Sequence, residues 1–412
     1  MLPKLSHLPV PAPLRRLPLP FVDKKVQYVK YDPNIDMLTP EDEKTMDRIV
    51  ASIEDFVRES PKINDIDYHA RDAHAKGYCA LKAEFTILPN LPDEYAQGVY
   101  AMPGKHEAVI RYSNGLSRVD VDRNLGLALG LAIKVFDIPG KKLAPGEEDS
   151  PNMDFNLINH PVFFCNRIED YEYISAIFRN ITEYMKHGEL IGKARVSAVW
   201  ATRGGHKLPT KQSLKTLKAF NGFTSIKPQN ALLYSYFSMG AVRHGDYMAK
   251  IRVKPTKASV RKILQRKINR DLHDEAIRLS ILDEIRKHDF EYDVQIQLCR
   301  NLDDQPINEI TDEWKEKDAP FVTVAKLRIP QQKVPDDGNF DIMENLSFTP
   351  FRCPEQNRPI GNLQHSRLRA YEAASKLRHK LNGVKREEPR NLAELFDDKQ
   401  NDNKRKRLFG LF

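Results

Sequence analysis

Three side chains near the C-terminal end of the sequence have types and a spacing that suit metal chemistry. Arg367, Tyr371 and Arg378 follow one another at intervals of four and seven residues. In a helix, this spacing places them on one stripe, within roughly 40° of one another. A guanidinium group favours the phenolate form of a nearby tyrosine, and a phenolate can bind ferric haem iron. The same pattern is also typical of a tyrosine that packs in an amphipathic helix with its arginines in water.

Three further segments place polar side chains beside apolar ones. His74 lies within the string RDAHAKG (residues 71–77), where a histidine near a turn can act as a general acid and base. Arg111 and Ser113 end an apolar strand-like run. Asn159 interrupts an apolar segment, so its amide either stabilises a turn or faces a ligand. Each residue also has an ordinary structural interpretation as a core histidine, a surface arginine or a turn asparagine.

Strands are predicted where apolar residues alternate with polar ones. The clearest case is residues 292–298, where Tyr, Val, Ile and Leu alternate with Asp and Gln. The full set of predicted strands is 79–87, 107–112, 131–136, 232–239, 248–253, 292–298 and 322–329. Because they do not alternate regularly with helices, they favour an antiparallel sheet or barrel with helical insertions, in the α+β class.

Helices are predicted on both sides of these strands. Residues 39–57 begin with Thr39 as N-cap and Pro40 in the first turn. Residues 166–222 read mostly as helix and loop, and 257–288 as a long charged helix. The last helix covers 363–382 and ends before Gly383, a residue type that favours helix termination.

Composition excludes several classes of protein. The chain has 412 residues, a net charge of +8 and no apolar run as long as a membrane span needs. Its four cysteines form no CxxC pair, which excludes a thiolate zinc site and favours a reducing compartment, so a cytoplasmic location is expected. The positive charge is read as spread along the chain, which is a weak argument for nucleic acid binding.

The predicted organisation has three parts. Residues 1–60 form a proline-rich arm and a helix, 61–383 a main domain, and 384–412 a charged tail. The tail ends in KRKRLFGLF, in which basic residues beside Leu and Phe suit weak contact with anionic lipid. A solvated terminus is the simpler interpretation of the same residues.

Four strings together resemble the haem pocket of the catalase superfamily. They are RDAHAKG at 71–77, VIRYS at 109–113, NHPVFF at 159–164 and the Arg367-xxx-Tyr371 helix with Arg378 seven residues later. They occur in the order found in that family and span most of the chain. The likeness is strongest to the shorter catalase-related haem proteins. It implies a catalase-like antiparallel β-barrel that holds haem b (ferric protoporphyrin IX) against a C-terminal proximal helix.

The resemblance also implies a role for each residue. His74 would be the distal acid and base, Ser113 would orient it, and Asn159 would hold the peroxide. Tyr371 would be the axial ligand of the haem iron, kept ionised by Arg367. The haem propionates would be held by Arg71, Arg111 and Arg378.

Some positions depart from the pattern of the large catalases. Ala73 stands where those enzymes carry a bulkier residue, which implies a roomier distal side. The segment before Asn159 matches less well, so Asn156 is the alternative distal amide. Tyr171 is a candidate for an aromatic position above the haem.

Three functions remain open at this point. The leading one is a haem-dependent hydroperoxidase acting on hydrogen peroxide or organic hydroperoxides. The second is an enzyme resembling allene oxide synthase, which rearranges a fatty-acid hydroperoxide. The third is a haem-binding protein without turnover. The expected partner is a small hydroperoxide substrate and not a nucleic acid, and a homo-oligomer is consistent with the family.

Overall fold

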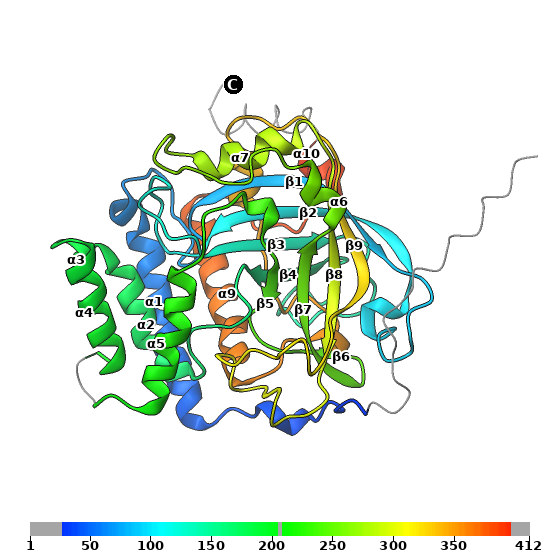
Figure 1. Ribbon diagram of the computed structural model, residues 1–412, viewed down its shortest axis with the longest axis horizontal. Coiled ribbons are helices and arrows are strands. Elements are labelled where there is room, and N and C mark those ends of the chain that lie inside the picture. Colours follow the sequence, from blue (N-terminus) through cyan, green and yellow to red (C-terminus); the bar gives the residue numbers. More distant parts are fainter. Residues whose placement is uncertain (1–26, 205–207, 397–412) are drawn as a thin grey trace, which may run out of the picture.

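Nine strands with mostly buried side chains form one antiparallel sheet (Figure 1) in residues 27–204 and 208–396, which the computed structural model describes. The order is β5-β4-β3-β2-β1-β9-β8-β7-β6, and pairing of β5 with β7 closes eight of the strands into a barrel. The bounds are β1 (Gly77–Ile87), β2 (Gly104–Asn114), β3 (Leu129–Val135), β4 (Met153–Ile158), β5 (Tyr236–Ser238), β6 (Val242–His244), β7 (Tyr247–Pro255), β8 (Phe290–Leu298) and β9 (Val322–Ile329).

The barrel strands are buried on both faces, for two different reasons. Apolar side chains such as Leu81, Ile110 and Leu131 fill the barrel interior and belong to its main core cluster. The outward faces of β2, β3 and β4 are covered by later segments of the chain, so polar residues such as Arg111 and Lys134 on these faces are also buried, the first against Glu344 and the second against Glu388. A polar side chain buried in this way must find a partner, which makes this outer face the place to look for chemistry.

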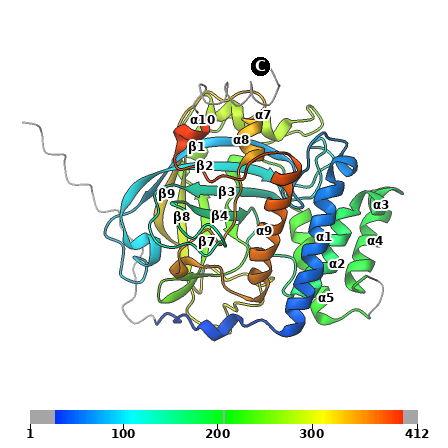
Figure 2. The same ribbon diagram turned by 180° about the vertical axis from the view of Figure 1, so that it is seen from behind.

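The helices gather mainly on one side of the barrel (Figures 1 and 2). The helix α9 runs beside the barrel, with α1 packed against its other side (Figure 2). A capping box of Thr39 and Asp42 begins α1, as the sequence predicts for Thr39. The bounds are α1 (Pro40–Asn64), α2 (Ile168–Arg179), α3 (Ile181–Met185), α4 (Glu189–Ala201), α5 (Lys211–Thr224), α6 (Lys257–Lys262), α7 (Ala276–Ile285), α8 (Phe340–Asn345), α9 (Asn362–Leu381) and α10 (Leu392–Phe396).

The predicted fold class is confirmed, and two elements of the prediction are wrong. The single charged helix over 257–288 is two helices, α6 and α7, joined by an irregular segment. Ile263 leaves the helix in an extended conformation because its side chain and that of Ile268 turn into the core. The predicted strand 232–239 shrinks to β5 because a 3-10 turn (Ala231–Leu233), capped by Asn230, occupies its first half.

Two strands were not predicted: β6, which has only three residues, and the longer β4. The β4 sequence MDFNLI alternates like a strand, but two of its polar residues, Asp154 and Asn156, lie on the outer face under other parts of the chain. The last helix is confirmed within a residue at each end, and Gly383 has the left-handed φ of 65° expected after a helix.

A buried ionic network fastens the C-terminal segment to the outer barrel face. Lys134 on β3 and Asp154 on β4 face each other, with Nζ and Oδ1 2.9 Å apart. Arg352 and Glu388 complete the network, since Glu388 pairs with both Lys134 and Arg352. All four side chains are buried or nearly so, and each charge has an opposite partner.

Two predictions lie outside the described residues, namely the extended proline-rich arm and the KRKRLFGLF tail. Within the described residues, none of the helices combines the length and the apolar content that a membrane span requires.

Candidate active site

His74 occupies a tight loop just before β1, in an uncommon backbone conformation. Its φ is 58°, in the left-handed region that side chains other than glycine rarely adopt. Such a conformation costs free energy and persists only where the surroundings hold it, which is a frequent property of functional sites. The Arg111 guanidinium donates to the His74 carbonyl oxygen at 3.1 Å and helps to fix this turn.

The imidazole of His74 rests against the barrel wall. Its Nδ1 lies 3.1 Å from the Ser113 hydroxyl oxygen. Beneath the ring is Gly130, where a Cβ atom would stand 2.5 Å from Cε1 and Nδ1. Glycine is therefore required at this position, because any side chain would push the ring off the wall.

Burial keeps His74 neutral. Desolvation, together with the positive charges of Arg111, Arg367 and Arg71, lowers the pKa of His74 from 6.5 to about 4. At neutral pH the ring therefore carries one proton, and the hydrogen bond to Ser113 at Nδ1 leaves Nε2 for other chemistry. A neutral imidazole can accept a proton, as a general base must.

Strand register identifies the other side chains that share this wall. Ser113 pairs with Gly130, and Gly130 with Ile158, so all three point to the side on which His74 lies. Arg111, Ala132 and Asn156 lie two residues away from these three on the same strands. Because side chains two residues apart point to the same side of a strand, they share this face. The wall therefore carries a serine, an arginine and an asparagine among small residues.

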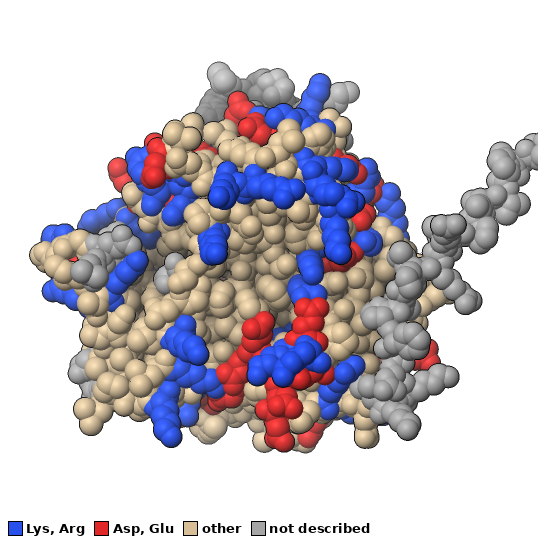
Figure 3. Space-filling model, in the orientation of Figure 1, with Lys and Arg blue, Asp and Glu red and all other residues tan. Residues whose placement is uncertain are grey.

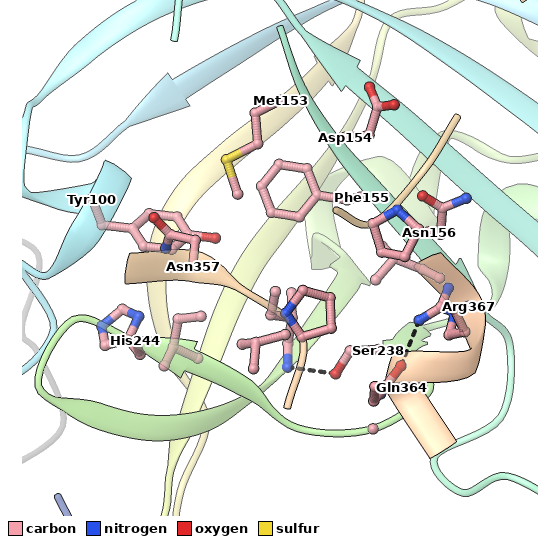
Figure 4. Close-up of a pocket in the computed structure, with 17 residues that line it drawn as sticks. Tyr100, Met153, Asp154, Phe155, Asn156, Ser238, His244, Asn357, Gln364 and Arg367 are labelled. Carbon is pink, nitrogen blue, oxygen red and sulfur yellow. Dashed lines mark hydrogen bonds between the residues drawn. The ribbon is translucent and has the colours of Figure 1, made fainter. Parts of the chain in front are cut away.

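Asn159 does not present its amide to this wall. Its Oδ1 accepts from the Leu129 amide at 2.8 Å, and its Nδ2 donates to the Leu127 carbonyl at 2.9 Å. Asn156 instead lines a cavity of ~40 Å³ together with Arg367 (Figure 4). Its Oδ1 is buried and has no hydrogen-bond partner among the described residues. Between the two asparagines considered from the sequence, the geometry favours Asn156 as the amide that faces a ligand.

Three of the predicted arginines converge on Glu344, two on its carboxylate and one on its backbone carbonyl. Glu344 of α8 forms ion pairs with Arg71 and with Arg111, the latter at 3.2 Å between Nη2 and Oε1. Arg378 of α9 donates to the backbone carbonyl of Glu344. Desolvation and the neighbouring guanidinium groups lower the pKa of Arg111 to about 10 and that of Arg378 as well. Three positive groups thus face a single negative side chain.

The fourth predicted arginine contacts the tyrosine of α9. Arg367 Nη2 donates to the Tyr371 hydroxyl oxygen at 3.2 Å, and its guanidinium carbon lies 5.3 Å from the centre of the tyrosine ring. Its other arm donates to the Gln364 side chain at 2.9 Å (Figure 4). The helical spacing read from the sequence therefore does bring Arg367 and Tyr371 together.

Solved structures of catalases share this architecture. Catalase A from Saccharomyces cerevisiae matches with a TM-score of 0.52 and 16% identity, over 93% of this chain and 76% of that chain. A fungal catalase matches with a TM-score of 0.52 and 14% identity, over 93% of this chain and 73% of that chain. The chain has a catalase-like fold. No protein-family model matches the sequence, and no curated protein is similar to it at a significant level.

The donor set of this catalase-like chain fits haem b. The porphyrin carries two propionate groups, and the three arginines around Glu344 have more positive charge than that one carboxylate neutralises. Arg111 Nε is buried without a hydrogen-bond partner among the described residues. Paired guanidinium donors suit carboxylates, so these residues could hold the propionates.

The helix that would supply the axial ligand fits as well. α9 packs against α1 and α2, and every residue from 367 to 375 is partly exposed although the helix runs beside the barrel (Figure 1). Two of these residues, Ala370 and Ala374, are small and flank Tyr371 along the helix. A tyrosine so placed, with an arginine on its hydroxyl oxygen, is a suitable iron ligand.

The sequence interpretation missed two residues of the site. Glu344 is the one acidic side chain in the stretch IMENLSF (342–348), and an isolated charge among apolar residues is the signal that could have found it. Gly130 left no such signal, because only the fold shows which side chain rests on it. Tyr171, a candidate from the sequence, is partly buried on α2, and its ring centre lies 6.4 Å from that of Phe163. Burial raises the pKa of Tyr171 above its ordinary value, and nearby Tyr371 contributes.

Proposed function

We propose that this chain is a haem-dependent hydroperoxidase. It would disproportionate hydrogen peroxide to water and oxygen, or reduce an organic hydroperoxide to its alcohol and water at the expense of an organic electron donor. The proposal is supported by a neutral histidine held by Ser113 on the barrel wall and by a tyrosine held by Arg367 on α9, and we infer that the two belong to one site. They are electrostatically connected, since the charge of Arg367 lowers the pKa of His74.

Each side chain has a definite task in this proposal. Bound haem would supply the ferric iron at which the peroxide reacts. His74 Nε2 takes the proton from the hydroperoxide and returns it to the departing oxygen, which then leaves as water or an alcohol. Ser113 keeps the imidazole in the required orientation and tautomer. The Asn156 amide, whose oxygen has no other partner among the described residues, would hydrogen-bond the peroxide.

The residues on the side of the proposed iron ligand have complementary tasks. Tyr371 would bind the iron, and Arg367 would stabilise its phenolate by charge and by the hydrogen bond at the hydroxyl oxygen. Arg71, Arg111 and Arg378 would bind the two propionates and so fix the plane of the porphyrin.

A second candidate reaction is rearrangement of a fatty-acid hydroperoxide. It is supported by Ala73, a small and exposed residue beside His74. The two reactions differ in product. Vigorous oxygen release from hydrogen peroxide without conversion of a hydroperoxy fatty acid would exclude the rearrangement.

The decisive experiment is an absorption spectrum of the purified chain with added ferric haem, followed by oxygen release on peroxide addition. We expect a Soret band in the wild type and its loss or displacement in Tyr371→Phe. A chain that shows no Soret band and binds no added haem would refute the proposal.

A variant of His74 separates an enzyme from a haem-binding protein without turnover. His74→Ala should keep the Soret band and lose turnover by a factor of about 10²–10⁴, the usual contribution of a positioned acid and base. Equal turnover in wild type and variant would contradict the role of His74. A wild type that binds haem but shows no turnover with either substrate would favour the non-enzymatic alternative.

A further inference from the structure

The positive charge of this chain is concentrated, contrary to the expectation that it is spread. Residues 250–270 contain nine Lys and Arg and no Asp or Glu, while the whole chain has a net charge of +8. Two of the nine, Lys250 and Arg252, are buried on β7. Six others are exposed on the end of β7, on α6 and on the segment after it: Lys254, Lys257, Arg261, Lys262, Arg266 and Lys267. We call these six residues the basic ridge.

Figure 3 shows this concentration as a band of Lys and Arg across the upper part of one face, where Figure 1 places α6 and α7. Within the part of the chain that the structure describes, Lys262 alone of the six has an acidic side chain within ion-pair distance, that of Asp289. Arg266 donates to the Val260 backbone carbonyl at 3.2 Å. The charge of the ridge is therefore largely uncompensated at the surface.

Two leucines in the same segment are unusually exposed. Leu264 is 78% exposed and Leu272 81%, whereas the neighbouring Ile263 and Ile268 are buried and anchor the segment to the core. Arg270 fixes the segment further by donating to the Asp122 carbonyl at 2.9 Å. The two leucines are thus presented by an anchored segment, and an apolar side chain held in water suggests a partner with an apolar interior.

We propose that the basic ridge, with Leu264 and Leu272, docks on an anionic membrane surface. Basic residues attract anionic headgroups, and adjacent leucines insert at the boundary between headgroups and acyl chains. Nucleic acid would bind the charges but would give the leucines no apolar environment. A second copy in a two-fold dimer would bring the same six cations face to face, which is repulsive.

The surface also lies close to the candidate site. Glu275, at the end of the segment, pairs with Lys76 at 2.9 Å, two residues from His74. Docking would therefore bring the site near a source of lipid. The docking itself does not depend on haem or on the proposed function.

The test is co-sedimentation of the full chain with vesicles of phosphatidylcholine alone and of phosphatidylcholine mixed with phosphatidylglycerol. We expect binding to the mixed vesicles only. The triple variant Lys257→Gln, Arg261→Gln, Lys267→Gln should bind on the order of 100-fold more weakly, about fivefold for each charge removed. The double variant Leu264→Ser, Leu272→Ser keeps every charge and should also bind at least tenfold more weakly.

A control triple variant removes the same charge elsewhere. Lys44→Gln, Lys317→Gln and Lys376→Gln alter side chains that are 71%, 75% and 61% exposed and lie outside the ridge. This control should bind like the wild type. All variants keep the C-terminal tail, so binding that is unchanged in the ridge variants would overturn the proposal.

Two further results would also overturn it. The first is tighter binding to a fluorescent DNA duplex than to the mixed vesicles, lost in the ridge triple variant. The second is a dimer in sedimentation equilibrium that the ridge variants abolish.

Discussion

At the scale of single residues, the position of His74 is fixed by its neighbours. The left-handed backbone and the serine at Nδ1 restrict the ring, and the absence of a side chain at Gly130 leaves the space in which it rests against the wall. This backbone conformation is energetically unfavourable, and a histidine that only filled space in the core would not require it. The same contacts determine its titration, and this gives a pH prediction.

Turnover should stay constant from neutral pH down to about pH 5 and fall toward pH 4. Desolvation and the positive charges of Arg111 and Arg367 lower the pKa of His74 to about 4, so the neutral base persists to low pH. The free energy of unfolding should depend on pH in the same direction as turnover. Between pH 6.5 and 4 the unfolded histidine binds a proton that the folded one does not, so the free energy of unfolding falls as pH falls through this window.

The measurement is the acid limb of kcat/KM, with Arg367→Gln for comparison. Removing this positive charge raises the pKa of His74, so the acid limb should move to higher pH. A wild-type limb near pH 6.5 would show that His74 is not held in the environment described.

Variants of the two asparagines should affect different properties, stability in one case and turnover in the other. Asn159→Leu removes both hydrogen bonds to the backbone of residues 127 and 129 and leaves two buried groups unpaired, so it should lower the free energy of unfolding by about 2–6 kcal/mol. Asn156→Leu removes a side chain whose oxygen has no partner among the described residues, so stability should change little while turnover falls. Urea unfolding and oxygen release measure the two effects. If Asn159→Leu folded normally and lost only turnover, Asn159 would be the distal amide.

At the scale of elements, β3 serves as the platform on which the imidazole rests. Gly130→Ala places a Cβ 2.5 Å from the His74 ring and 2.9 Å from the Ser113 hydroxyl. The ring must move away from the wall, so turnover should fall at least tenfold and the free energy of unfolding by about 1–3 kcal/mol. Gly126→Ala is the matched control, because a Cβ at Gly126 meets nothing within 4 Å. Similar turnover in both variants would contradict the platform role.

The sequence predicts this platform only in part. Alternation located seven of the strands because their apolar residues point into one barrel interior. It failed at β4, although its sequence MDFNLI does alternate, and at β6, whose three residues are too few to show alternation. The segment after α6 was taken as helix from its charge pattern, but the burial of Ile263 and Ile268 turns the chain away from a helical path.

Prediction of the site was limited in a similar way. Spacing along α9 was enough to pair Arg367 with Tyr371, because contacts within a helix are local. The choice between Asn156 and Asn159 depends on the register of β3 with β4, which no local pattern reveals. Glu344 meets Arg71 across 273 positions of sequence, a separation at which only the fold can bring two residues together.

At the scale of the whole molecule, charge is sorted into three regions. The basic ridge faces solvent, with largely uncompensated cations. The network of Lys134, Asp154, Arg352 and Glu388 is buried, and each charge in it is paired. The cluster around Glu344 is also buried, but it has three guanidinium groups for one carboxylate. Excess positive charge in a buried cluster destabilises the fold unless a binding partner supplies negative charge.

This difference between the two buried clusters predicts how each responds to haem. Glu344→Gln removes the only carboxylate among the described residues that pairs with Arg71 and Arg111, so the haem-free chain should lose about 3–5 kcal/mol of stability. If the haem propionates bind these arginines, haem restores negative charge there and should stabilise this variant more than it stabilises the wild type. Glu388→Gln is the matched control: it should also destabilise the haem-free chain, because it breaks pairs with Lys134 and Arg352, but haem should give it no extra stabilisation. Urea unfolding with and without added ferric haem measures all three chains. An equal gain in the two variants would mean that the propionates do not bind at Glu344, because only a local supply of negative charge can distinguish one buried cluster from the other.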